Sequence, residues 1–155
     1  MRLWRALAAA LVIVAIGSAV GSRPHQPVAG TDPLNSVNAG APVPAAVRST
    51  LQRACADCHS DQTRWPWYAS IPVASYLIAR DVNEARAQLN LSRWAQYNPF
   101  DRADMLDKIC ERASSGKMPP WQYRMMHSEA RLSAADVSAL CAWSEQEATR
   151  LVEGQ

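Results

Sequence analysis

Apolar side chains recur at helical spacing in four segments of this chain. The segments run over residues 44–55, 72–89, 98–116 and 133–151, and the first begins at Pro44, which suits a first helical turn. Apolar positions three and four residues apart place one stripe of each helix against a core. No segment alternates apolar and polar residues over the length of a strand, so the pattern predicts an all-α domain of about four helices.

Residues at the ends of these segments support the boundaries. Asn98 followed by Pro99 supplies an N-cap and a first-turn proline, and Gly116 suits a helix end in the left-handed conformation. The last helix has the clearest start, because Ser133 suits an N-cap and Asp136 follows it by three residues. In the second segment, the stripe predicted to face the core consists of Ala74, Leu77, Ile78, Val82, Ala85 and Leu89.

The N-terminus has the composition of an export signal. A basic start containing Arg2 and Arg5 precedes an uncharged, largely apolar run from Ala6 to Val20. Residues 1–21 are therefore expected to act as a signal peptide or, if they are retained, as a membrane anchor. In both cases the rest of the chain faces the periplasm, either soluble or anchored to the inner membrane by residues 6–21.

The next segment, residues 22–43, is rich in Pro, Gly, Ala, Asn and Ser, which is typical of a flexible linker. Residues 44–152 are then expected to form the folded domain. The net charge of +2 falls to zero if Arg2 and Arg5 are removed, and no cluster of Lys and Arg marks a nucleic-acid surface. We expect no nucleic-acid partner, and membrane contact only through the N-terminal segment.

The five residues Cys55-Ala-Asp-Cys58-His59 carry the candidate chemistry of the chain. A zinc site would need further ligands, and no second pair with the usual spacing follows. A redox-active dithiol belongs at the start of a helix in a strand-containing unit, whereas this pair follows a helix. Two thiols three residues apart and an adjacent imidazole match the covalent attachment of one haem, with His59 as the proximal iron ligand.

A second iron ligand is sought among the methionines. Met118 is the candidate, because Pro119 and Pro120 restrict the backbone directly after it and so help to hold its thioether in place. Met105 lies inside a predicted helix, and the other competitors have no comparable restraint. The competing ligands are Met105, Met125, Met126 and His127.

The order of these features resembles the class I cytochrome c fold over residues 44–152. A narrower resemblance links the chain to the bacterial haem-binding domain family named for its CxxCH motif. It is carried by CADCHSDQTRWPWY at 55–68, Ile-Pro-Val at 71–73, the segment 89–94, GKMPPW at 116–121 and the segment 127–133. The resemblance implies a cytochrome c-like bundle around one covalently attached haem c, preceded by an N-terminal hydrophobic helix, and it leaves the physiological role undefined.

Several side chains near the motif are candidates for contact with the haem. Aromatic rings directly after the motif would wall the porphyrin edge, and Arg64 would pair with a propionate. Ordinary loop packing and an exposed arginine are the alternatives. Trp121 and Trp143 also suit the core, with haem contact as a second interpretation. The candidates for the haem pocket are Arg64, Trp65, Trp67, Tyr68 and Trp121.

Two cysteines remain outside the motif. Cys110 and Cys141 both lie on the apolar stripes of their predicted helices. In an oxidising compartment such a pair favours a disulfide, and two buried free thiols are the alternative. A disulfide here would enclose Met118 in its loop and brace the segment that carries it.

Together these features predict a mono-haem c-type cytochrome that carries single electrons in the periplasm between redox partner proteins, whose donor and acceptor the sequence does not identify. Cys55 and Cys58 would attach the haem, and His59 and Met118 would bind its iron. We expect an electron carrier and not an enzyme, with no catalytic residue. The alternative is a haem-based ligand sensor or small peroxidase with an open distal site.

Overall fold

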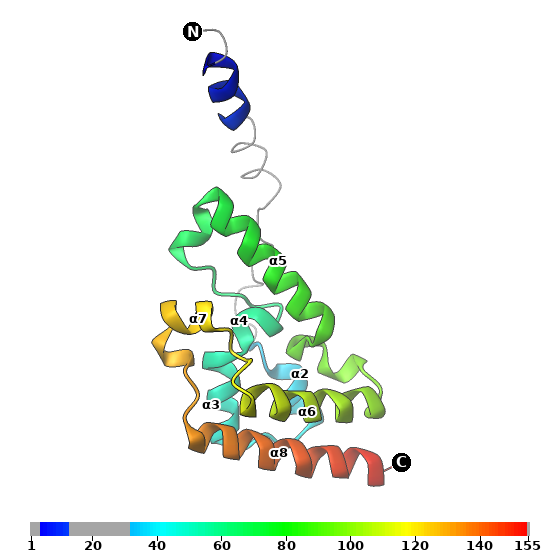
Figure 1. Cartoon of the computed structure of the whole chain (residues 1–155). Coiled ribbons are helices and arrows are strands. Elements are labelled where there is room, and N and C mark those ends of the chain that lie inside the picture. Colours follow the sequence, from blue (N-terminus) through cyan, green and yellow to red (C-terminus); the bar gives the residue numbers. More distant parts are fainter. Residues whose placement is uncertain (1–3, 13–31, 155) are drawn as a thin grey trace.

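The computed structural model of the protein describes residues 4–12 and 32–154, and no strand occurs among them (Figure 1). Residues 4–12 form an exposed helix. The all-α prediction is confirmed for this part of the chain. The later elements are α2 (Asn35–Gly40), α3 (Ala45–Ala54), α4 (Ala56–His59), the 3-10 helix η1 (Trp67–Ser70), α5 (Pro72–Gln88), the 3-10 helix η2 (Leu91–Gln96), α6 (Pro99–Ser114), α7 (Trp121–Met126), the 3-10 helix η3 (Ser128–Ala130) and α8 (Ala134–Glu153).

The four predicted helices correspond to α3, α5, α6 and α8, and the signals at their ends act as expected. The Asn98 side chain accepts a hydrogen bond of 2.9 Å from the backbone N–H of Asp101. Gly116 has a φ of 66°, which glycine adopts without strain. Ser133 and Asp136 form a complete capping box, with hydrogen bonds of 3.1 and 2.8 Å between each side chain and the other's backbone N–H.

The core lies between α6 and α8, which run side by side in Figure 1, with α3 beside them. Leu106 of α6, Leu140 of α8 and Leu51 of α3 are each buried to 1% exposure or less. Burial of each such side chain stabilises the fold by about 1.5–3 kcal/mol. Trp143 of α8 is also buried, so its interpretation as a core residue is confirmed.

The predicted flexible linker over residues 22–43 is wrong for its C-terminal part. Leu34 and Val37 are fully buried, and α2 packs on η2. The ring of Trp94 comes so close to Gly40 that a Cβ there would lie 3.3 Å from its Cδ1 atom. Leu34, directly before the helix, and Val37 within it dock this short segment, although its composition is that of a linker. Residues 22–31 lie outside the described residues.

The predicted signal peptide or anchor falls mostly outside the described residues, since only residues 4–12 of its 21 are described. Over the described part of the chain, none of the helices combines the length and the hydropathy needed to cross a membrane.

Helix α5 differs from its prediction in what it buries. Of its predicted apolar stripe only Val82 is buried, and Leu77 remains 44% exposed. The helix packs on α4 and η1 and not on the α6–α8 core, and in Figure 1 it rises away from those two helices. Its N-terminal half therefore presents large apolar side chains, including Val73 at 72% exposure, beside the segment that carries the cysteine motif.

Candidate functional site

The CxxCH motif forms the joint between α3 and α4. Cys55 caps the end of α3 and the start of α4. Its carbonyl oxygen accepts hydrogen bonds from the backbone N–H groups of Cys58 at 3.2 Å and His59 at 2.9 Å. Residues three and four apart on a helical turn share one face, so the turn gathers both thiols and the imidazole on one side.

Both motif cysteines are free thiols. Burial, followed by the neighbouring Cys58, raises the pKa of the Cys55 thiol to about 12. Burial, followed by the nearby Asp57 and Asp81 carboxylates, raises the pKa of Cys58 to about 11. A redox-active dithiol requires the opposite shift, because the thiolate is the nucleophile. The zinc hypothesis also gains no support, since no group of three or more metal-ligating side chains gathers among the described residues.

The imidazole of His59 is held by the backbone at the end of α5. Its Nδ1 atom lies 3.0 Å from the carbonyl oxygen of Leu89. A carbonyl only accepts hydrogen bonds, so Nδ1 carries the proton and Nε2 carries the lone pair of the neutral ring. Burial lowers the pKa of His59 against the opposing effect of backbone hydrogen bonds, which favours this neutral form. His59 is thus a neutral imidazole of fixed orientation, which is the state in which histidine generally binds metals.

Asp57, one of the two residues between the cysteines, is a hydrogen-bonding centre that no sequence pattern marked. It is buried, and its carboxylate accepts a hydrogen bond of 2.8 Å from the Tyr123 hydroxyl of α7. The same carboxylate pairs with the Arg64 guanidinium at 3.1 Å. Arg64, predicted as a partner of a haem propionate, is therefore engaged by Asp57, although its side chain remains 71% exposed.

Met118 lies in the segment between α6 and α7. Its backbone N–H donates to the carbonyl oxygen of Arg112 at 3.1 Å, and its side chain is 39% exposed. The peptide bond that follows is cis, and Pro119 is buried. The hydrogen bond from Tyr123 to Asp57 brings the helix that follows Met118 onto the turn that carries His59.

The aromatic candidates take different positions. Tyr68 is half-buried, and its hydroxyl lies 3.0 Å from Nε2 of His127. Trp67 and Trp121 are 77% and 60% exposed, so the interpretation of Trp121 as a core residue is wrong. Trp65 is half-buried, and its indole N–H is buried with no acceptor within hydrogen-bond distance.

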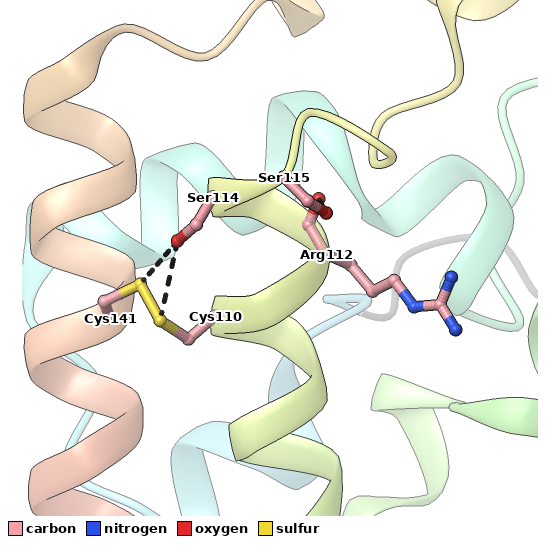
Figure 2. Close-up of a disulfide and its surroundings, with 5 residues drawn as sticks. All are labelled: Cys110, Arg112, Ser114, Ser115 and Cys141. Carbon is pink, nitrogen blue, oxygen red and sulfur yellow. Dashed lines mark hydrogen bonds between the residues drawn. A yellow bond between two sulfur atoms is a disulfide. The ribbon is translucent and has the colours of Figure 1, made fainter.

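Cys110 and Cys141 are joined by a disulfide between α6 and α8 (Figure 2). The Ser114 hydroxyl lies 3.3 Å from the sulfur of Cys141 and 3.7 Å from that of Cys110. Disulfide sulfurs carry no proton, so the hydroxyl is the donor. The crosslink is placed two residues before Arg112, whose carbonyl holds Met118, and it fixes the end of α6 to α8.

Three contacts of the site had no signal in the sequence. They join His59 to Leu89, Asp57 to Tyr123, and Tyr68 to His127, over separations of 30, 66 and 59 residues. The only local sign was the placement of Asp57 inside the motif. Helical patterns report which faces of helices are apolar, and they carry no information on hydrogen bonds between distant loops.

The site is therefore of a definite class. In a helical domain, a single turn presents two protonated thiols and one neutral imidazole. The sequence model of a family described as "haem-binding domain" matches residues 11–146, which is most of the chain. The chain belongs to this haem-binding domain family, and the expectation of a haem cofactor is supported. Neither the curated proteins nor the solved structures include a match to this chain.

The residues around the motif fit a haem group. Large apolar side chains that are exposed in one region commonly mark a binding site. A porphyrin, which has large apolar faces and edges, is a group that such side chains would contact. The indole N–H of Trp65, which has no acceptor, would be satisfied by a group such as a propionate. The exposed apolar side chains at residues 67–77 and 118–126 include Trp67, Ile71, Val73, Leu77, Met118, Trp121, Met125 and Met126.

Proposed function

We propose that this protein is a mono-haem c-type cytochrome that carries single electrons. The observation that carries the proposal is the arrangement on α4. Cys55 and Cys58 are free and protonated, and they share a turn with a neutral His59 that Leu89 orients. The thiols would attach one haem covalently, and His59 would bind its iron from the proximal side. The bound group would supply a one-electron redox couple.

The rest of the proposal concerns the distal side and the cellular setting. Met118 would be the distal ligand, because the hydrogen bond to Arg112 and the two following prolines restrict the backbone around it. A thioether ligand favours the reduced iron and raises the potential. The exposed rings of Trp67 and Trp121 would offer an apolar contact surface to a redox partner protein. The composition of the N-terminus supports a periplasmic location, soluble or anchored by residues 6–21.

The test is to express the full chain together with haem-attachment machinery. We expect a mass increase of one haem that survives denaturation, and a reduced-minus-oxidised spectrum of c type. The variants Cys55→Ala and Cys58→Ala should each retain haem through one thioether only, and the double variant should lose it on denaturation. A wild-type protein without covalent haem would refute the proposal.

A haem-based sensor or small peroxidase is the second candidate. It is favoured by one observation, the 39% exposure of Met118, which would allow its displacement by an external ligand. Binding of carbon monoxide to the reduced protein separates the two functions. An electron carrier with a stable methionine ligand should bind carbon monoxide slowly, whereas a sensor should bind it rapidly and completely.

A further inference from the structure

Helix α7 is held in place by polar contacts and not by burial. None of its six residues is buried, so the hydrophobic core does not determine where it lies. Its first turn is attached to α4 by the hydrogen bond from Tyr123 to Asp57, and its C-terminal residue is followed by His127, which meets Tyr68. Two hydroxyl groups, those of Tyr123 and Tyr68, therefore join α7 and the residue after it to distant parts of the fold.

The Tyr123 contact is the stronger of the two by its chemistry. Its hydroxyl donates to a buried carboxylate at 2.8 Å, and hydrogen bonds to charged acceptors are about twice as strong as neutral ones. Burial and then the hydrogen bond to Asp57 raise the pKa of Tyr123, so it remains a donor at all physiological pH values. Its ring also stacks on His127, with centroids 4.3 Å apart.

This contact acts on Met118 through a short and stiff connection. Met118 precedes Tyr123 by five residues, and the rings of Pro119 and Pro120 fix two of the intervening φ angles. On the other side, the hydrogen bond to Arg112 ties Met118 to α6. Asp57 and His59 lie in the same helical turn of α4. The hydrogen bond from Tyr123 to Asp57 therefore attaches α7 to the turn that carries the proposed proximal ligand.

We propose that Tyr123 is a positioning residue, which places the Met118 segment opposite His59 by bonding to Asp57 of the CxxCH turn. This inference rests on the proposed function, because it concerns the methionine assigned there as the distal ligand. Without the hydroxyl, α7 loses its attachment at the end nearest Met118 while the core and the cysteines are unchanged.

The test compares three tyrosine-to-phenylalanine variants of the full-length, haem-loaded protein. Tyr123→Phe removes the proposed contact, and Tyr68→Phe removes the contact at the far end of α7. Tyr76→Phe removes an exposed hydroxyl from α5 and serves as the matched control. The readouts are amide hydrogen exchange in α7, the weak absorption band of methionine-ligated ferric haem near the red end of the spectrum, and the rate of cyanide binding.

We expect Tyr123→Phe to accelerate both exchange in α7 and cyanide binding by on the order of tenfold, as loss of a charge-assisted hydrogen bond implies. Tyr68→Phe should accelerate exchange near His127 with a smaller effect on cyanide binding, and Tyr76→Phe should change neither. Unchanged exchange and cyanide binding in Tyr123→Phe would overturn the inference.

The variant Met118→Ala distinguishes this failure from failure of the proposed function. If Met118→Ala abolishes the red-end band while Tyr123→Phe behaves as wild type, only the positioning role is refuted. If Met118→Ala leaves the spectrum unchanged, the distal assignment is refuted, and the positioning role with it.

Discussion

The Nδ1 atom of His59 lies 3.0 Å from the carbonyl oxygen of Leu89. This contact joins α4 to the end of α5 and sets the ring orientation and tautomer of the proposed proximal ligand. The carbonyl is positioned by its neighbour, Asn90, which is 3% exposed. The Asn90 side chain accepts from the backbone N–H of Ser92 at 3.0 Å and donates to Asp61 at 2.8 Å.

Replacement of Asn90 is therefore expected to affect both stability and the haem. Asn90→Ala should lower the free energy of unfolding by about 1–3 kcal/mol, because buried hydrogen bonds are lost. A weaker hydrogen bond between His59 and the Leu89 carbonyl makes the imidazole a poorer electron donor to the iron. The reduction potential of the haem should therefore rise. Urea denaturation and a redox titration measure the two effects, with the exposed Gln96→Ala as control. A potential equal to that of the wild type would contradict this role.

The assignment of Met118 as the distal iron ligand is tested by the same Met→Ala substitution at three positions. Met118→Ala should abolish the red-end band of the ferric protein, since no thioether would bind the iron. Met125→Ala and Met126→Ala are matched controls, because both residues are exposed and lie on the adjacent α7. They should retain the band. Loss of the band in one of these controls, with its persistence in Met118→Ala, would assign the ligand elsewhere.

The helices could be predicted from the sequence because their signals are local. Ser133 and Asp136 are three residues apart, and their capping box forms as expected. Asn98 and Gly116 mark the ends of α6 for the same reason. The packing of these helices was less predictable. Leu77 belongs to an apolar stripe of helical spacing and yet is 44% exposed. Such a stripe shows that one face of a helix is apolar, but it does not show which element covers that face.

The site shows the same division. Cys55, Cys58 and His59 could be named from their spacing, since one turn of helix contains all three. The contact between Asp57 and Tyr123 spans 66 residues and depends on where α7 lies in space. Composition also misled at residues 34–41, where a segment resembling a linker docks through Leu34 and Val37.

The docked segment gives a prediction for stability. Leu34→Ala should lower the free energy of unfolding by about 2–5 kcal/mol, because it leaves a cavity where a fully buried side chain packs. Val152→Ala removes an apolar side chain that is 53% exposed and should cost far less. Urea denaturation of the two variants makes the comparison. Equal stability of Leu34→Ala and the wild type would restore the interpretation of this segment as a linker.

The disulfide between Cys110 and Cys141 gives a second prediction for stability. It closes a loop with a sequence separation of 31, and its removal in Cys110→Ser with Cys141→Ser should cost about 4 kcal/mol on a chain-entropy estimate. Because the crosslink fixes the end of α6 next to Met118, the double variant should also bind cyanide faster. Thiol titration of the denatured, unreduced, haem-loaded protein is the direct check, and two free thiols would exclude the bond.

The link between α3 and the start of α8 predicts how stability depends on pH. The Asp136 carboxylate pairs with Arg53 at 2.6 Å and accepts from Thr50 at 2.9 Å. Arg53, then the backbone and hydroxyl of Ser133, hold the pKa of Asp136 well below its usual value of 3.8. A carboxyl with a depressed pKa in the folded state stabilises it above the unfolded pKa, and the contribution is lost as pH falls below that value.

Asp136→Asn should therefore lower stability near neutral pH by about 1–2 kcal/mol, a modest figure because solvent screens a carboxylate at the surface. The difference from the wild type should shrink as the pH falls below about 4, because Asp136 then binds a proton in the unfolded state, whereas the folded state binds it only at a lower pH. Urea midpoints measured across this range test the sign. Asp104→Asn, which removes an exposed ion pair with Lys108, is the control and should change stability little at any pH. A constant difference between Asp136→Asn and the wild type at all pH values would show that the charge of Asp136 contributes nothing.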